Sequence, residues 1–419
     1  MSPLAGAPAA MPPGALSRVK VLDLSRVLAG PWAGQTLGDL GAEVIKVERP
    51  GHGDDTRAWG PPFVTDVQGQ PTGESAYYMC ANRNKQSVTI DFTRPAGQAV
   101  VRALAAGSDV VIENFKSGGL AAYGLDYESL SALNPRLVYC SITGFGQTGP
   151  YAHRAGYDFL IQGMGGLMSI TGQPDGTPGG GPAKVGVALA DILTGLYAST
   201  AILAALQARE HTGRGQHIDL ALLDVQVACL ANQGMNYLYG GNVPQRMGNA
   251  HPNTVPYQDF PTSDGHMILA VGNDGQFARF CQAAGRPEWA TDECFATNAA
   301  RLAHREVLVG LLRELTVQRS TREWIALLEQ HAVPCGPINT VADVFADEQV
   351  RARGMQISMD HPQAGRVPLV ANPIRLSDTP VQYRAGPPQL GQHNTDVLRD
   401  RLGMSADAIE ELTRQGVLG

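Results

Sequence analysis

Short apolar runs alternate with longer mixed segments through the first half of the chain. The first run is Val19–Leu24 and the second is Glu43–Val47, and the segment between them opens at Gly30-Pro31 and closes at Gly41. Proline in the first turn and glycine just beyond the last turn are typical boundaries of an α-helix. Two apolar strands joined by one helix form a βαβ unit, whose strands run parallel. The pattern therefore predicts that the chain begins an α/β domain.

The same alternation continues as far as residue 222. We expect helices over Pro95–Ala106 and Tyr127–Leu133, and strands over Asp109–Ile112, Arg136–Ile142 and Gln216–Leu220. A parallel sheet of this kind is buried on both faces by the helices that connect its strands. The predicted fold class is therefore α/β: a large Rossmann-like domain with a parallel sheet, accompanied by a smaller α/β domain.

Two long apolar segments follow. Ile192–Ala208 is uncharged over 17 residues, which is short for a membrane span and is typical of a buried helix. Leu222–Tyr239 is predicted as an apolar helix, and a loop-rich stretch comes after it. We divide the chain into a flexible tail (1–16), the N-terminal part of the large domain (17–222), a linker (223–256), a small domain (257–335), and a linker that returns to the large domain (336–419).

Composition narrows the class of protein. The 419 residues include 49 Gly and 28 Pro without a period of three, which indicates many turns and excludes collagen. The net charge is −7 and only 17% of residues are charged, so we expect no nucleic-acid partner. Residues 1–120 contain as many basic as acidic side chains, so an anionic small molecule is expected to bind in this first third.

The sequence does not support a metal site, a signal peptide or a nicotinamide-binding site. The six cysteines form no CxxC pair, and no second histidine stands at a ligand spacing from His251, so no metal site is predicted. Residues 1–16 lack the basic and apolar regions of a signal peptide, and we expect a cytoplasmic protein with no membrane contact. Gly144–Gly149 matches GxGxxG, but Pro150 and Tyr151 follow where a nicotinamide site needs a helix. A glycine-rich turn is favoured there over a dehydrogenase.

Asp191 stands at the head of the long apolar segment. It can be an ordinary helix N-cap. The same carboxylate, oriented by amide donors and the helix dipole, can also attack an activated acyl group. Gly163–Gly166 and Gly179–Gly181 precede it, either as turns or as places where amides approach an oxyanion. Basic residues follow the predicted strands, where ligands of open α/β sheets bind: Arg26, Lys46, Arg49, Arg83, Lys85 and Lys116.

Motifs along residues 18–419 resemble, in order, those of the class III CoA-transferases, the CaiB/BaiF family that includes formyl-CoA transferase. They are VLDLSRVLAGP (21–31), GAEVIKVERPGHGDDTR (41–57), NRNKQS (82–87), DVVIENF (109–115), YCSITGFGQTGP (139–150), RAGYD (154–158), HIDLALLD (217–224), RMGNAHP (246–252), GPIN (336–339) and PPQLGQH (387–393). GDDTRAWGPPFV (53–64) is similar to the succinyl-CoA-dependent, dicarboxylate-using branch.

This resemblance implies a catalytic nucleophile and a coenzyme site within residues 17–222. The family's nucleophile is the aspartate before the long apolar helix, here Asp191. Other members carry His and Gln where this chain has Arg26 and Leu28, and one carries Arg in place of Ala122, so individual hydrogen bonds differ. The positions that match the family's CoA contacts are Arg26, Val27, Leu28, Ala29, Arg49, Ile90, Asn114 and Phe115.

The family also contains α-methylacyl-CoA racemases, which carry histidine in an AGHD motif. Here Tyr157 takes that place, and a tyrosine with an ordinary pKa near 10 is a poor base at neutral pH. The substitution favours transfer over racemisation. A racemase and a non-catalytic CoA-binding protein remain the alternatives.

The implied activity is transfer of CoA from an acyl-CoA, with succinyl-CoA as the expected donor, to a free carboxylic acid. The expected acceptor is a dicarboxylate such as glutarate or hydroxymethylglutarate, and the reaction runs through aspartyl-anhydride and aspartyl-CoA intermediates. Thioester exchange needs no permanently bound cofactor and no metal. The family forms interlocked homodimers, so a homodimer is expected. The candidate substrate-binding residues are Tyr157, Arg154, Arg246 and His251.

Overall fold

The computed structural model describes residues 13–419, which form two compact units. The first unit comprises residues 13–166, 185–234 and 349–419, and the second comprises residues 167–184 and 235–348. Most of the tail expected over 1–16 lies outside the described residues. Within its described part, the amide of Leu16 donates to the carbonyl of Leu40 at 2.9 Å, so the chain is already held against the first unit there.

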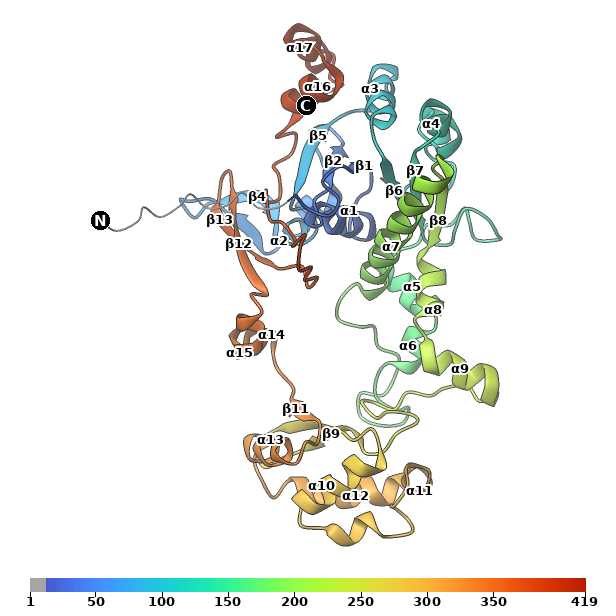
Figure 1. The fold of residues 1–419 in the computed structure, drawn as a ribbon, viewed down its shortest axis with the longest axis vertical. Coiled ribbons are helices and arrows are strands. Elements are labelled where there is room, and N and C mark those ends of the chain that lie inside the picture. Colours follow the sequence, from blue (N-terminus) through green and yellow to red (C-terminus); the bar gives the residue numbers. More distant parts are fainter. Residues whose placement is uncertain (1–12) are drawn as a thin grey trace, which may run out of the picture. The chain divides into compact units, whose positions relative to one another are not determined.

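A six-stranded parallel sheet forms the centre of the first unit, in the order β5-β2-β1-β6-β7-β8 (Figure 1). This is the Rossmann order, so the predicted α/β class and Rossmann-like sheet are confirmed. The strands are β1 (Lys20–Asp23), β2 (Glu43–Glu48), β5 (Lys85–Thr89), β6 (Val110–Glu113), β7 (Val138–Thr143) and β8 (His217–Ala221).

The strand order reverses between β1 and β6. Chain segments that leave the carboxyl ends of these two neighbouring strands diverge, and ligands of open α/β sheets bind in the crevice that results. The segment after β1 holds residues 24–28, and the segment after β6 begins at Asn114. The expected coenzyme contacts therefore come from both sides of this reversal.

Helices cover both faces of the sheet, because its strands alternate apolar side chains between two buried clusters. One cluster joins the sheet to α3 (Pro95–Ala106), α4 (Tyr127–Leu133), α16 (Asn394–Leu402) and α17 (Ala406–Arg414). The other joins it to α1 (Ala29–Asp39) and α7 (Leu189–Thr212). The C-terminal segment thus returns to the large unit.

The second unit has its own core around a three-stranded antiparallel sheet, β9 (Tyr257–Pro261), β10 (His266–Ala270) and β11 (Cys335–Pro337). Phe260, Phe280 and Trp324 are buried in that core. Its helices include α10 (Asp274–Ala283), α11 (Asn298–Ala303), α12 (Arg305–Thr316) and α13 (Thr321–Gln330).

The remaining elements are short. They are η1 (Asp55–Ala58), β3 (Phe63–Thr65), β4 (Pro71–Ser75), α2 (Ala76–Met79), η2 (Ala121–Tyr123), α5 (Asp158–Met164), α6 (Leu167–Ile170), α8 (Leu222–Ala228), α9 (Ala231–Gly240), η3 (Pro287–Ala290), α14 (Val341–Ala346), α15 (Glu348–Ala352), β12 (Gln356–His361) and β13 (Gly365–Val370).

The structure differs from the sequence predictions at several places. The helix expected over Leu222–Tyr239 is two helices, because Ala231, where the second helix begins, has a left-handed φ of 47° that interrupts a continuous right-handed helix. The linker expected over 223–256 therefore begins with helices. Residues 167–184 belong to the second unit rather than to the large domain. Strand β5 was not predicted, since its sequence KQSVT begins with polar residues.

Helix α7 is only partly buried, whereas the sequence predicted a buried helix. By length and composition it could cross a membrane, but 44% of its apolar window is already buried inside this chain. Leu196, Tyr197 and Leu203 are exposed. We therefore interpret α7 as a core helix with one uncovered apolar face.

Candidate active site

Asp191 lies in the first turn of α7, at its third residue. The N-cap is Ala188, which has no side-chain cap, so the N-cap reading of Asp191 is wrong. A carboxylate in the first turn is stabilised by the helix dipole and is held on a rigid element. Among the described residues, no donor is hydrogen-bonded to the Asp191 carboxylate, which leaves it available to a substrate.

Asp158, the first residue of α5, caps α7 in place of its own N-cap residue. Its Oδ1 accepts from the amide of Ala190 at 2.8 Å and from the amide of Asp191 at 3.4 Å. Gln162, one turn further along α5, donates to Asp158 Oδ2 at 2.7 Å and accepts from the amide of Val185 at 2.9 Å. The two side chains of α5 thus hold the chain on both sides of the turn that presents Asp191.

Burial and then the neighbouring charge of Asp158 raise the pKa of Asp191 to about 7. The aromatic residues nearby belong to the same unit. Burial first, and then negative charges that include those of Asp191 and Asp158, raise the pKa of Tyr77 to about 12. Trp59 packs its ring edge-on against Tyr77, with 5.3 Å between centroids. A carboxylate in such partly apolar surroundings loses hydration and is a stronger nucleophile.

We expect the reaction with an acyl-CoA donor to slow below pH 7. The folded-state pKa of Asp191 is raised to about 7, so the nucleophilic carboxylate is present above that pH and is lost as the pH falls through it. The value of kcat/KM for the donor should therefore fall about tenfold for each pH unit well below 7. Steady-state kinetics between about pH 5 and 8 test this.

The buried carboxyl of Glu113 provides the control for this dependence of kcat/KM on pH. Burial raises its pKa to about 7 as well, and its Oε2 accepts from the amide of Phe115 at 2.8 Å. The Glu113→Gln variant should keep the fall of kcat/KM below pH 7 (the acid limb of the profile), because we assign that fall to the protonation of Asp191. A profile that is flat in the wild type, or that loses its limb in Glu113→Gln, would contradict the assignment.

Helix α7 packs tightly against the first turn of α1. A Cβ added at Gly195 would lie 2.7 Å from the carbonyl oxygen of Ala29 and 3.0 Å from the Cβ of Trp32. Only glycine permits this approach, which brings the helix of Asp191 beside the loop that precedes α1. Gly195 was not singled out from the sequence, although it lies one turn after Asp191.

Within the glycine runs before Asp191, close packing and turns account for several positions. A Cβ at Gly165 would lie 2.4 Å from Cγ of Gln226, so this glycine permits the close packing of α5 and α8. Gly166 has a left-handed φ of 84°. Gly179–Gly181 belongs to the second unit, where the amide of Gly180 donates to Thr177 in a turn.

Three of the eight expected CoA contacts meet at the carboxyl ends of β1 and β6. Asn114 Oδ1 accepts from the amide of Arg26 at 2.9 Å, and its Nδ2 donates to the Arg26 carbonyl at 2.7 Å. The Arg26 guanidinium lies over the ring of Phe115, 5.2 Å from its centroid. It also contacts Asp55 at 3.3 Å, an exposed pair that an anionic ligand can replace at small cost.

The other five expected contacts differ in their exposure. Val27 is half-buried with a φ of 70°, and Leu28 and Ala29 are buried at the start of α1. Arg49 is exposed after β2, and within residues 13–419 no carboxylate lies at ion-pair distance from it. Ile90 is 1% exposed in the core beneath α3, so only its backbone can reach a ligand.

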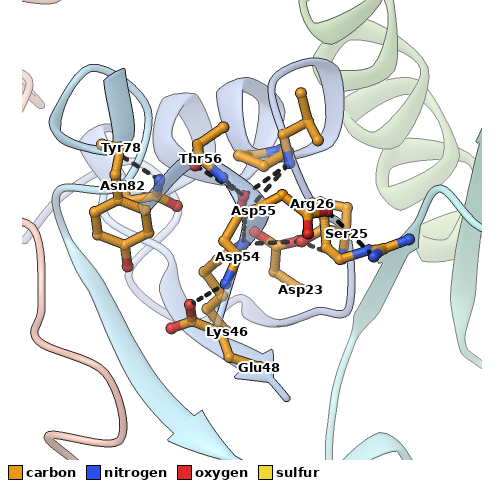
Figure 2. Close-up of polar contacts among 12 residues, drawn as sticks. Asp23, Ser25, Arg26, Lys46, Glu48, Asp54, Asp55, Thr56, Tyr78 and Asn82 are labelled. Carbon is orange, nitrogen blue, oxygen red and sulfur yellow. Dashed lines mark hydrogen bonds and ion pairs between the residues drawn. The ribbon is translucent and has the colours of Figure 1, made fainter. Parts of the chain in front are cut away.

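A buried ionic network supports the loop between β1 and α1 (Figure 2). Lys46 and Asp54, both with fully buried side chains, form an ion pair of 2.8 Å. Lys85 pairs with Asp23 at 2.9 Å, also fully buried. Lys46 and Lys85 were expected where a ligand binds, but their ammonium groups are already engaged inside the protein.

The candidate substrate-binding residues divide between the two units. In the first, Tyr157 is 67% exposed, and Arg154 stacks on Phe145 and Tyr151. Among the described residues, no carboxylate lies at ion-pair distance from Arg154. In the second unit, Arg246 pairs with Asp175, and Nδ1 of His251 accepts from the amide of Asn253 at 3.0 Å. Of the two arginines, Arg154 therefore has the less compensated charge.

The GxGxxG segment does not have the geometry of a dinucleotide site. The amide of Gly146 donates to Oγ1 of Thr143, and the amide of Gln147 donates to the Asp219 carboxylate at 3.0 Å. The next helix, α5, begins only at Asp158. Because a nicotinamide site needs a helix that opens on the glycines, a dehydrogenase is not supported.

Comparisons with known proteins agree with the motifs. The model of CoA-transferase family III matches residues 16–394. A succinate–glutarate CoA-transferase of Agrobacterium fabrum is 55% identical over 92% of this chain and 95% of its own. A human succinyl-CoA:glutarate CoA-transferase is 45% identical over 96% and 90%. The crystal structure of a CaiB/BaiF family protein from Brucella suis is 55% identical, with a TM-score of 0.81, and covers 93% of this chain and 100% of that one.

Proposed function

Since this chain belongs to CoA-transferase family III, it is a CoA-transferase, and we propose that its donor is succinyl-CoA and its acceptor is glutarate. The observation that supports the substrates most strongly is the identity of 55% and 45%, over nearly the whole chain, to two transferases named for them. The observation that supports the chemistry is a carboxylate at the start of α7, with a pKa raised to about 7, on a helix that packs through Gly195 against the first turn of α1.

The first half of the proposed reaction transfers CoA to the enzyme. An oxygen of the Asp191 carboxylate attacks the thioester carbonyl of succinyl-CoA, the C–S bond breaks, and CoA leaves as the thiolate. The product is a mixed anhydride of Asp191 and succinate. The thiolate then attacks Cγ of Asp191, and succinate leaves with one oxygen that came from the aspartate. The enzyme now carries an aspartyl-CoA thioester.

The second half repeats these steps in reverse order with the acceptor. A carboxylate oxygen of glutarate attacks Cγ of Asp191 and displaces the CoA thiolate. The thiolate then attacks the glutaryl carbonyl of the new anhydride, which gives glutaryl-CoA and restores the Asp191 carboxylate. One thioester is exchanged for another, so the free energy of the bond is conserved and no nucleotide is hydrolysed.

The protein supplies position, electrostatics and exclusion of water. Asp158 and Gln162 hold the first turn of α7, so Asp191 meets both substrates at a fixed place. The amides of Ala190 and Asp191 are bonded to Asp158, so the contribution of α7 is its dipole, whose positive end favours the negative charge that develops near the first turn. Water must be kept away, because it would hydrolyse that anhydride.

The acceptor's distal carboxylate needs a cation, and we propose Arg154. Its guanidinium rests on two aromatic rings and lacks a carboxylate partner among the described residues, so it can receive a carboxylate without first breaking an ion pair. It lies in the same unit as Asp191 and four residues before Asp158.

A matrix of acyl-CoA donors against free acids tests the proposed substrates. With succinyl-CoA as donor and mass spectrometry as readout, glutarate should give glutaryl-CoA faster than hydroxymethylglutarate or a monocarboxylate of similar length. Deuterated water provides the control for a racemase, because a racemase exchanges the α-proton of a branched acyl-CoA and a transferase leaves it unlabelled. CoA binding without any exchanged product would contradict the proposal.

We further propose that the protein is a homodimer. The exposed side of α7 supports this, because it carries the large apolar side chains of Leu196, Tyr197 and Leu203, while the opposite side of the helix packs in the core. Light scattering at micromolar concentration should give twice the mass of one chain. The mass of a single chain would contradict a homodimer.

We also propose that the enzyme works in the cytoplasm. Its proposed substrates, CoA thioesters and dicarboxylates, are water-soluble anions, which supports an aqueous compartment. Fractionation of cells, followed by assay of succinyl-CoA consumption, should recover the activity with the soluble proteins, and activity confined to membranes would contradict this.

A further inference from the structure

Val27 has a backbone conformation that its side chain disfavours. Its φ of 70° lies in the left-handed region, where a β-branched residue crowds its own backbone. Val27 stands in the loop that supplies four expected CoA contacts, residues 26–29. Strained conformations of this kind persist only when the surrounding structure enforces them. Contacts from neighbouring side chains must therefore hold Val27 in this conformation.

The backbone groups around Arg26 are all bonded to side chains from other segments. Lys46 donates to the carbonyl of Ser25 at 2.8 Å. Asn114 is bonded to both the amide and the carbonyl of Arg26. The carboxylate of Asp54 accepts from the amide of Val27, with both oxygens at 3.2 Å. From the Ser25 carbonyl to the Val27 amide, no backbone polar group is left to solvent.

Asp54 is itself fixed from every side. Its Oδ2 accepts from Lys46 at 2.8 Å, and its Oδ1 accepts from the amide and the hydroxyl of Thr56 at 3.0 and 2.8 Å. Its own amide donates to Glu48 at 2.9 Å. Figure 2 shows Asp54 between Lys46 and Thr56, below the loop that carries Arg26. Since these partners are buried, the loop rests on a rigid support.

We propose that Asp54, held by Lys46, is the positioning residue that keeps Val27 in its left-handed conformation and so presents the loop of residues 26–29 to the coenzyme. The inference rests on the proposed function, because it takes that loop as the CoA site. It assigns Asp54 a role in coenzyme affinity and none in the chemistry at Asp191.

The charge of Asp54 is essential to this role, because every group that contacts its carboxylate is a donor. An asparagine places two hydrogens among the amide of Val27, the amide of Thr56 and the ammonium of Lys46. Whichever way the new amide turns, one donor faces another. The Asp54→Asn variant is therefore expected to release Val27 although its shape is unchanged.

Calorimetric titration with free CoA, together with steady-state kinetics, tests the proposal. For Asp54→Asn we expect the Kd for CoA and the KM for succinyl-CoA to rise about tenfold, with kcat and the KM for glutarate within about threefold of the wild type. The matched control is Asp66→Asn, whose carboxylate accepts from the amides of Gln68 and Gln70 in the β3–β4 turn. It should bind CoA as the wild type does.

A rescue by glycine separates loop positioning from a general loss of structure. Glycine adopts a positive φ without steric cost, so Val27→Gly should need Asp54 less. In that background, we expect Asp54→Asn to weaken CoA binding by no more than about threefold. Equal penalties in both backgrounds, or an unchanged Kd in Asp54→Asn, would overturn the proposal.

The Asp54→Asn substitution leaves Lys46 as a buried charge without its carboxylate partner. If the variant fails to fold for that reason, a second variant keeps the proposal testable. The double variant Lys46→Met/Asp54→Leu removes both charges at similar volume, which folded proteins often tolerate. It should fold and bind CoA about tenfold more weakly, and normal CoA affinity would overturn the proposal. A wild type that binds no CoA would instead contradict the proposed function, so the two failures are distinguishable.

Discussion

Replacing Asp191 with alanine is expected to lower kcat by about 10⁴-fold or more while the Kd for CoA stays within about threefold of the wild type. The variant loses the oxygen that attacks the thioester, and no other carboxylate occupies the first turn of α7. Binding should persist because the proposed coenzyme contacts lie in the loop before α1 and the segment after β6, not at Asp191. Single-turnover assays of succinyl-CoA consumption, with calorimetry for CoA, measure the two effects separately.

Asp224 offers a matched control for Asp191. It is likewise the third residue of a helix, α8, and it is exposed. The Asp224→Ala variant makes the same change at the same helical position without touching the proposed chemistry, so its kcat should stay near that of the wild type. Substantial turnover by Asp191→Ala would contradict the nucleophile assignment.

The second large effect is expected at Asp158. Removing its carboxylate in Asp158→Ala leaves the amides of Ala190 and Asp191 without their acceptor, so the first turn of α7 frays and the nucleophile is misplaced. We expect kcat to fall about 10²-fold, since small misplacement of a reacting group is costly. The free energy of unfolding, followed by thermal denaturation, should change much less than the activation free energy that corresponds to the fall in kcat.

The pH profile distinguishes this positioning role from a merely structural one. Because the negative charge of Asp158 contributes to the raised pKa of Asp191, its removal should move the acid limb of kcat/KM to lower pH. Asp158→Asn keeps an oxygen for the Ala190 amide, so it should show the same shift with a smaller loss of rate. A wild-type rate and an unmoved limb in both variants would contradict the role.

The sheet was predictable because its strands are apolar on both faces and alternate with helices of standard boundaries. Strand β5 is the exception: Lys85 opens it and is fully buried, since Asp23, Pro31 and Asn82 accept its three hydrogen bonds. That pairing joins positions 62 residues apart, and no local pattern reveals it. Residues 167–184 escaped prediction for the same reason, as Arg246 donates to the Ser169 carbonyl from 77 residues away.

The site was predictable where it depends on strand ends and motifs. Arg26, Asn114 and Phe115 follow neighbouring parallel strands, and the fold brings the three residues together. The supporting residues were missed, because Asp158, Gln162 and Asp54 act through backbone amides that only the folded chain brings near. Two local signals were present in the sequence: Asp158 ends the RAGYD motif, and Asp54 lies in GDDTR.

The covalent route through Asp191 is tested most directly by following oxygen from the acceptor. In the proposed reaction, glutarate labelled with ¹⁸O in its carboxylates forms the second anhydride through one labelled oxygen, and that oxygen stays on the aspartate when glutaryl-CoA leaves. Mass spectrometry of the peptide that contains Asp191 should therefore find one ¹⁸O atom in its carboxylate after a single turnover with succinyl-CoA, and up to two after many turnovers. An unlabelled Asp191 after complete conversion to glutaryl-CoA would contradict the mechanism.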